Sequence, residues 1–125
     1  MNSIKLGVLF SRVRVEEKWI FENLERRAIP YERIDDRQIK LSLGAPGFWS
    51  TFDVVLERSL SYKNGLYTTQ VLNAWGIPTV NMAHVAATCG DKLATSAALI
   101  RAGVPQPRVW LAFTQEAALE IMETA

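Results

Sequence analysis

Apolar residues gather in short runs that polar segments separate, and their spacing predicts an alternation of strands and helices. Continuous apolar runs at 4–10 and 53–57 are typical of buried central strands. Apolar residues at Ile20, Leu24 and Ala28 repeat with helical spacing and predict a helix over 15–28, which Pro30 ends. The other predicted strands cover 31–34, 79–80 and 108–113, and the other predicted helices cover 64–75, 83–87, 91–102 and the segment after the capping residue Thr114.

Strands that alternate with helices indicate an α/β fold with an open, mostly parallel sheet and helices on both faces. We expect four or five strands, with 4–10 and 53–57 at the centre because they are the most continuously apolar. Sheets of this kind bind ligands at the carboxyl ends of their strands. Polar residues that directly follow a strand are therefore the first candidates for a functional site.

Composition narrows the class of protein. A length of 125 residues suits one compact domain, and a net charge of +1 argues against nucleic-acid binding through phosphate contacts. The opening apolar run is too short to cross a membrane. The single cysteine, Cys89, allows no internal disulfide and fits a reducing compartment. We expect a cytoplasmic protein without a nucleic-acid or membrane partner.

The predicted last helix has an unusual end. It reaches Ala125 without a glycine or a basic last turn, and Glu120 and Glu123 stand where cations are preferred. We therefore expect Ala125 to be a cut point in a longer protein.

Several common motifs are absent from the sequence. The first strand is followed by Ser-Arg-Val-Arg rather than a glycine-rich dinucleotide turn, and no Walker A, H-E-x-x-H or C-x-x-C motif occurs. The single histidine, His84, does not make a metal site with Cys89.

Three arginines stand where a parallel sheet binds ligands. Arg12 and Arg14 follow the first strand, and Arg58 follows the strand at 53–57. Guanidinium groups suit carboxylates or phosphates. The alternatives are that Arg12 and Arg14 are solvated turn residues, and that Arg58 pairs with Glu57 or Asp53.

Lys92 opens the strongest predicted helix, directly after Asp91. A lysine at a helix amino terminus opposes the helix dipole unless an anion lies there. The position suits a phosphate contact, and a solvated surface lysine is the alternative.

Motifs along the whole chain resemble one enzyme family. Segment 81–107 resembles the entry to an ATP-grasp domain. It fits the pattern D-K-x-x-(T/S)-x-x-x-L-x-x-x-G-(V/I)-P-x-P with Asp91, Lys92, Thr95 or Ser96, Leu99, Gly103, Val104, Pro105 and Pro107. The segments SRVRVEEKWIFE, VVLERSLSYKNGL, GIPTVN and CGDKLATS resemble the LysX family, the amino-group-carrier ligases of lysine biosynthesis, which are relatives of RimK-type ligases.

The resemblance implies a reaction and its partners. Enzymes of this family use ATP and magnesium to phosphorylate the C-terminal glutamate of a small acidic carrier, LysW, and the amino group of α-aminoadipate or glutamate then attacks the acyl phosphate. It implies that Lys92 contacts ATP, and it leaves Arg12, Arg14 and Arg58 as candidates for substrate or carrier carboxylates. Catalytic residues and metal ligands are expected outside this chain.

The resemblance also implies a division of the chain. Residues 1–88 would form a pre-ATP-grasp domain, and 89–125 a linker helix, strand and helix that enter ATP-grasp lobes missing from this chain. A fragment of this kind would be inactive alone, and an uncovered apolar face around Val109, Leu111 and the last helix would favour a homo-oligomer. The alternatives are a RimK-like glutamate ligase acting on a protein or cofactor, and a stand-alone binding module without catalysis.

Overall fold

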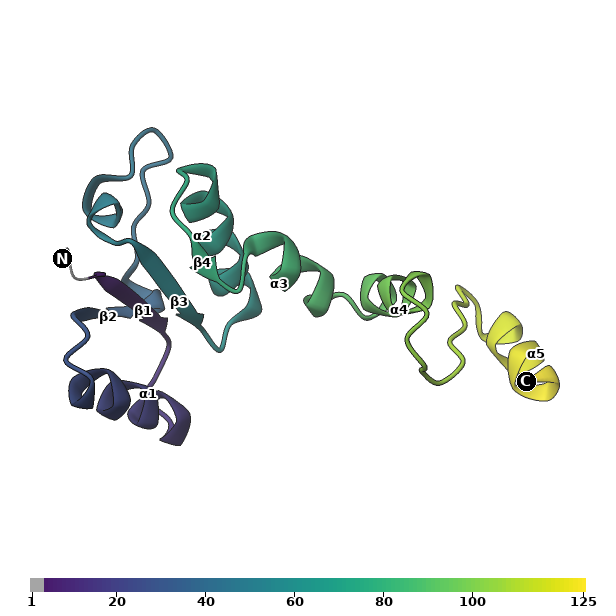
Figure 1. Ribbon diagram of the computed structural model, residues 1–125. Helices are drawn as coiled ribbons and strands as arrows, with labels where there is room; N and C mark the ends of the chain where they lie inside the picture. The colour runs from purple at the N-terminus through teal and green to yellow at the C-terminus, as the bar shows by residue number, and fades with distance from the viewer. Residues whose placement is uncertain (1–3) are drawn as a thin grey trace. The chain divides into compact units, whose positions relative to one another are not determined.

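The computed structural model describes residues 4–125, and four parallel strands form the sheet found in this part of the chain (Figure 1). The spatial order is β2-β1-β3-β4. The two most apolar segments, β1 and β3, therefore occupy the centre, as predicted. The strands are β1 (Leu6–Phe10), β2 (Tyr31–Asp35), β3 (Val54–Arg58) and β4 (Thr79–Val80).

Helices cover both faces of the sheet, so the predicted open α/β fold is confirmed. In Figure 1, α1 (Val15–Arg26) lies below the sheet and α2 (Tyr62–Ala74) lies above it. α3 (Ala83–Gly90) packs against α2. The connection from β2 to β3 contains two short 3-10 helices, η1 (Asp36–Gln38) and η2 (Gly47–Thr51).

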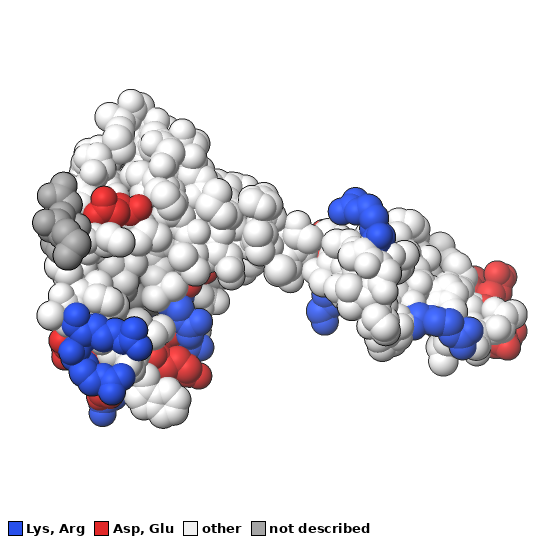
Figure 2. Space-filling model, in the orientation of Figure 1, with Lys and Arg blue, Asp and Glu red and all other residues white. Residues whose placement is uncertain are grey.

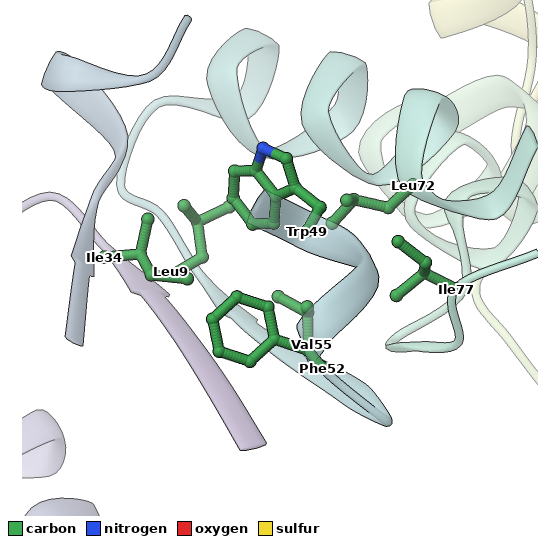
Figure 3. Close-up of a cluster of buried hydrophobic side chains, with 7 residues drawn as sticks. All are labelled: Leu9, Ile34, Trp49, Phe52, Val55, Leu72 and Ile77. Atoms are coloured by element: carbon green, nitrogen blue, oxygen red, sulfur yellow. The ribbon is translucent and has the colours of Figure 1, made fainter. Parts of the chain in front are cut away.

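The main core lies between the sheet and α2 (Figure 3). Successive strand residues point to opposite faces, so Leu9 and Val55 face α2 while Val8 faces α1. All three are fully buried. On the α1 side, the ring of Phe21 stacks on Tyr31 and meets Phe10 edge to face. The core cluster on the α2 side consists of Leu9, Ile34, Trp49, Phe52, Val55, Leu72 and Ile77.

α1 ends at Arg26, two residues before the predicted end, because the chain reverses there toward β2. Ala28 adopts a positive φ of 52°, and the amide of Ile29 donates to the carbonyl of Leu24 over 3.0 Å. Glycine usually occupies such a left-handed position after a helix. Alanine at this position stores a small backbone strain.

Residues 91–125 form a separate unit, which contains α4 (Lys92–Arg101) and α5 (Gln115–Thr124). The Asp91 carboxylate caps α4 by accepting from Ala94 N over 2.9 Å, and the Thr114 hydroxyl caps α5 by accepting from Ala117 N over 3.2 Å. Gly103 follows α4 with a φ of 67°, in the left-handed region. Neither helix contains a buried residue.

The strand predicted at 108–113 is wrong. The segment forms no regular structure, and residues 91–125 contain no strand with which it could pair. A strand is stabilised by its neighbours, so an apolar run without a neighbouring strand does not form one. No helix within residues 4–125 is both long enough and apolar enough to cross a membrane.

Candidate active site at the carboxyl edge of the sheet

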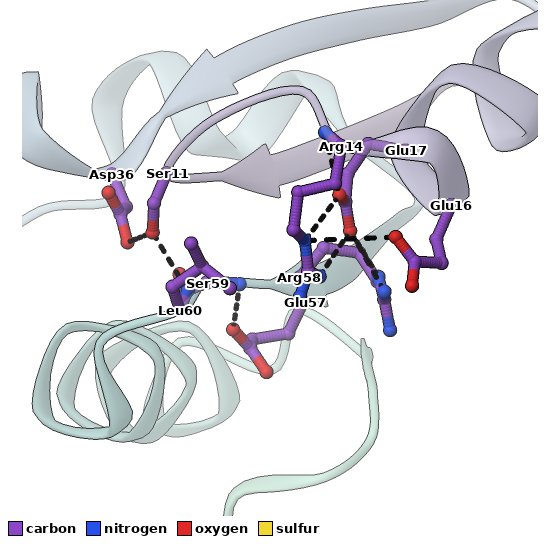
Figure 4. Close-up of polar contacts among 9 residues, drawn as sticks. All are labelled: Ser11, Arg14, Glu16, Glu17, Asp36, Glu57, Arg58, Ser59 and Leu60. Carbon is purple, nitrogen blue, oxygen red and sulfur yellow. Dashed lines mark hydrogen bonds and ion pairs between the residues drawn. The ribbon is translucent and has the colours of Figure 1, made fainter.

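The topology places a candidate ligand site between the carboxyl ends of β1 and β3. The chain leaves β1 to form β2 on one side and returns to form β3 on the other side. The crevice at such a change of direction is where open α/β sheets bind ligands. Two polar networks occupy this edge (Figure 4).

The first network is centred on Glu17, whose side chain is fully buried in the first turn of α1. Arg14 binds it through two bonds, Nε to Oε2 at 2.8 Å and Nη2 to Oε1 at 2.7 Å. Arg58 also binds it through Nε and Nη2, which both donate to Oε1 at 3.0 and 2.8 Å. One buried carboxylate thus holds two guanidinium groups that come from different strand ends.

The network holds Glu17 ionised. Hydrogen bonding from Arg14 is the largest influence, and together with Arg58 it lowers the pKa of Glu17 to about 2, although burial acts in the opposite direction. The same hydrogen bond raises the pKa of Arg14. The two guanidinium groups outnumber the buried Glu17 carboxylate, and the exposed carboxylate of Glu16 lies 3.9 Å from Arg14 Nε beside them.

Both arginines keep hydrogen-bond donors that Glu17 does not use. Glu17 engages the Nε and Nη2 groups of each, and no hydrogen bond of either Nη1 group is found within residues 4–125. Each arginine side chain is 33% exposed. Fixed, partly exposed guanidinium groups are well suited to bind a carboxylate.

The alternative partners considered for Arg58 are wrong. Neither Glu57 nor Asp53 pairs with it; the carboxylate that does is Glu17. Glu57 instead accepts from the amide of Ser59 over 2.6 Å, and Asp53 accepts from the amide of Lys5 over 2.7 Å.

The second network ties three strand ends together through Ser11. Its hydroxyl donates to Asp36 Oδ2 over 2.7 Å and accepts from the amide of Leu60 over 2.8 Å. Asp36 is 6% exposed, and its Oδ1 atom has no hydrogen-bond partner among residues 4–125. The ends of β1, β2 and β3 are therefore joined by one hydroxyl.

The other predicted site residues lie apart from these networks. Arg12 is exposed, two residues beyond the end of β1. Lys92 is exposed at the first position of α4, in the unit formed by residues 91–125. Cys89 is exposed. Within residues 4–125, no three or more histidine, cysteine or acidic side chains are grouped as metal ligands.

Sequence reasoning missed Glu17, Ser11 and Asp36. One signal was present for Glu17, because it stands three residues after Arg14, the spacing of a capping box. Its carboxylate does accept from the amide of Arg14 over 3.1 Å. Ser11 and Asp36 had no comparable local signal.

Comparison with known families shows to which family this chain belongs. The sequence model of the LysX preATP-grasp domain matches residues 6–88, which is more than half of the chain. This chain belongs to the LysX preATP-grasp family. The resemblance that its motifs indicated is therefore confirmed, as is the assignment of the fold.

Curated relatives that are similar to this LysX-family chain are LysW ligases. A glutamate–LysW ligase ArgX from Sulfurisphaera tokodaii is 37% identical over 96% of the chain and 42% of the relative. Its counterpart from Sulfolobus acidocaldarius is 32% identical over the same shares. An α-aminoadipate–LysW ligase LysX from Sulfurisphaera tokodaii is 27% identical over 93% of the chain and 41% of the relative.

A solved structure shares the fold of this LysX-family chain. The RimK domain ATP-grasp protein from Sphaerobacter thermophilus matches it with a TM-score of 0.78 and 25% identity, over 96% of this chain and 45% of that one. The chain thus spans less than half the length of the relatives and of the solved structure that it matches.

Proposed function

We propose that this chain is the amino-terminal part of an ATP-dependent carboxylate–amine ligase. The enzyme joins the amino group of glutamate to the C-terminal glutamate of a small, acidic, LysW-like carrier protein. The observation that carries the proposal is similarity to two glutamate–LysW ligases, at 37% and 32% identity over 96% of the chain. The α-aminoadipate–LysW ligases are less similar, at 25% and 27% identity.

In this proposal the arginine pair binds a substrate carboxylate. Both the amino acid and the carrier terminus present carboxylates, and Arg14 and Arg58 form a cationic pair at the edge where such folds bind ligands. Glu17 is a positioning residue, because it orients both guanidinium groups without facing solvent itself. Arg12 is exposed nearby in sequence and would approach the acidic carrier by charge attraction.

One residue of this chain is suited to bind a phosphate group of ATP. When bound, ATP supplies the phosphoryl group that converts a carboxylate into a reactive acyl phosphate, with magnesium offsetting the phosphate charge. Lys92 is exposed at the start of α4, so its ammonium group is available to bind a phosphate oxygen. Residues 4–125 contain no group of three or more histidine, cysteine or acidic side chains that could hold a metal ion, and we assign the magnesium ligands to the rest of the enzyme.

The test is ligation by the complete gene product. The purified enzyme is mixed with carrier protein, ATP, magnesium and either glutamate or α-aminoadipate. The mass of the carrier is then measured by mass spectrometry. We expect addition of one glutamyl residue. Addition of an aminoadipyl residue alone would identify the second candidate substrate, which similarity to the LysX ligases supports. An unmodified carrier in both reactions would overturn the carrier-ligase proposal.

One arginine variant tests the carboxylate site, and a second arginine variant serves as its control. We expect Arg58→Gln to raise the KM for amino acid or carrier on the order of tenfold or more, since it removes a charged hydrogen-bond donor. The matched control is Arg33→Gln, because Arg33 pairs with Glu25 on the surface of β2 and α1. Equal effects of both variants would count against a role for Arg58 in binding.

Residues 1–125 alone should not turn over ATP. The magnesium-binding carboxylates are assigned to the rest of the enzyme, and without the metal the charge of the transferring phosphoryl group is not offset. Magnesium-dependent acyl-phosphate formation by the 125-residue chain would contradict this assignment.

A further inference from the structure

A second hollow lies at the carboxyl edge of the sheet, where β3 and β4 end. Its volume is about 350 Å³, which falls in the range of small-molecule sites. Glu57, near the end of β3, supplies the only carboxylate among the described residues that line it, and we call it the Glu57 hollow. Hydroxyl and amide groups complete its polar lining, from Ser59, Ser61, Tyr62 and Asn81.

Contacts at the start of α2 fix the Glu57 carboxylate. Its Oε1 atom accepts from the amide of Ser59 over 2.6 Å, as Figure 4 shows. The carboxylate lies against Gly65 of α2, where a Cβ atom would come within 2.6 Å of Oε1. The positive end of the helix dipole favours a carboxylate at this place. Glycine at position 65 thus leaves the space that the carboxylate occupies.

Two polar atoms of the Glu57 hollow lack a partner. Within residues 4–125, Glu57 forms no ion pair, and its Oε2 atom accepts no hydrogen bond. The Oγ atom of Ser59 is buried and also has no partner in this part of the chain. Buried polar groups are rarely left unsatisfied, and Glu57 is itself partly buried. The hollow therefore offers acceptor groups to a donor that the described chain does not supply.

The surroundings of the Glu57 hollow supply no cation either. None of the described residues that line it is a lysine or an arginine. Figure 2 shows an uncharged surface over α2 and α3 in this view, whereas basic and acidic atoms gather at the lower left, where α1 lies. Arg58, the next residue of β3, is bound to Glu17. A positively charged donor for Glu57 is therefore expected from a ligand.

We propose that the Glu57 hollow binds the α-amino group of the amino acid substrate, an inference that rests on the proposed ligase function. An ammonium group has one positive charge and three N–H donors, which match a carboxylate among hydroxyl and amide oxygens. Consecutive strand residues point to opposite faces, so Glu57 and Arg58 place opposite charges on the two sides of one strand end. The end of β3 therefore presents a counterpart for each charge of an amino acid.

Comparison of glutamate with 2-hydroxyglutarate, in which a hydroxyl replaces the amino group, isolates this contact. Isothermal titration calorimetry measures both dissociation constants on the complete enzyme, with its carrier and a nonhydrolysable ATP analogue bound. We expect the unaltered enzyme to bind glutamate on the order of tenfold more tightly, because a charge-assisted hydrogen bond is stronger than a neutral one. Glu57→Gln keeps the acceptor for the Ser59 amide and should remove most of this preference. The matched compound for α-aminoadipate is 2-hydroxyadipate.

Gly65→Ala moves the same carboxylate without removing its charge. The added Cβ atom would lie 2.6 Å from Oε1, so the end of the Glu57 side chain has to shift. We expect the same loss of preference, and alanine suits a helix interior, so the fold is retained. Glu32→Gln is the matched control and should leave the preference unchanged, because Glu32 of β2 pairs with Lys5 over 3.2 Å.

The outcomes separate this inference from the proposed function. An equal affinity of the unaltered enzyme for both compounds, or a preference that survives Glu57→Gln or is lost equally in Glu32→Gln, would overturn the Glu57 assignment while ligation stays intact. If circular dichroism shows that Glu57→Gln does not fold, Gly65→Ala decides in the same way. An enzyme that ligates neither amino acid to its carrier would overturn the proposed function itself.

Discussion

The two parts of the chain, 4–90 and 91–125, form helices by the same local rules. They differ in whether those helices bury side chains in a core. Both parts contain capped helices: the hydroxyl of Ser61 caps α2, and Asp91 caps α4. Only the first part encloses a core, with Leu9, Val55 and Leu72 fully buried. In the second part no residue of either helix is buried, and Phe113 is 90% exposed. Capping and helical spacing therefore determine where a helix forms, and burial depends on other elements.

The largest expected difference in the free energy of unfolding is between two leucine-to-alanine substitutions, one in each part. Leu72→Ala removes a fully buried side chain from α2 and should lower the free energy of unfolding by about 2–5 kcal/mol. Leu93→Ala removes a side chain that is half exposed on α4 and should change it by less than about 0.5 kcal/mol. Urea unfolding of both variants measures the contrast. Equal losses would show that α4 has a core of its own.

The next largest effect concerns the buried ion cluster. Glu17→Gln leaves Arg14 and Arg58 without their counter-charge and should destabilise the first unit by about 3 kcal/mol at neutral pH. Because the pKa of Glu17 is lowered from 4.5 to about 2, its contribution is complete above the ordinary value and disappears as the pH falls toward 2.

Urea midpoints between pH 7 and pH 2 measure this dependence. The pKa of Asp35 is also lowered to about 2, by its hydrogen bond from Arg37, and Asp35 remains in both proteins. The difference between unaltered chain and variant therefore isolates Glu17. A difference that stayed constant across this range would mean that Glu17 does not titrate as the cluster requires.

A smaller gain is expected where α1 ends. Ala28→Gly relieves the strain of a positive φ of 52° and should raise the free energy of unfolding by about 0.5–1 kcal/mol, although glycine also loses more entropy on folding. Gly103 already occupies the equivalent position after α4, so Gly103→Ala should have the opposite sign. Thermal unfolding of the two variants tests both directions.

The smallest effect on folding belongs to Lys92. Its side chain is exposed beside the positive end of the α4 dipole, so Lys92→Ala should change the free energy of unfolding by less than about 0.5 kcal/mol. In the complete enzyme the same change should slow ATP-dependent ligation about a hundredfold, as loss of a positioned charge does. Unchanged ligation at limiting ATP would make Lys92 an ordinary surface lysine, and a large fall in melting temperature would give it a structural role.

The sequence predicted the features that depend on neighbouring residues and on continuous apolar runs. The central positions of β1 and β3 followed from their composition, and Thr114 was recognised as a cap from its own side chain. Features that depend on distant partners could not be predicted. The segment 108–113 has the composition of a strand but no partner strand within its unit.

The candidate site shows the same limit. The positions of Arg14 and Arg58 after their strands could be predicted, because the carboxyl ends of parallel strands share one edge. Their convergence on Glu17 could not, since Arg58 and Glu17 are 41 residues apart and glutamates on helices are usually solvated. Which charged residue becomes buried depends on the assembled fold.

The central place of β1 also has a consequence for how the chain folds as it is made. β1 leaves the ribosome before both of its neighbours, and one of them, β3, begins only at Val54. At a synthesis rate of about 5–20 residues per second, β1 waits roughly 2–10 s with an unpaired edge. During this time Val8 and Leu9, which are fully buried in the finished sheet, are open to other chains. Protection of this first strand is therefore a matter of timing, and slower translation between β1 and β3 would lengthen the interval in which the nascent chain can aggregate.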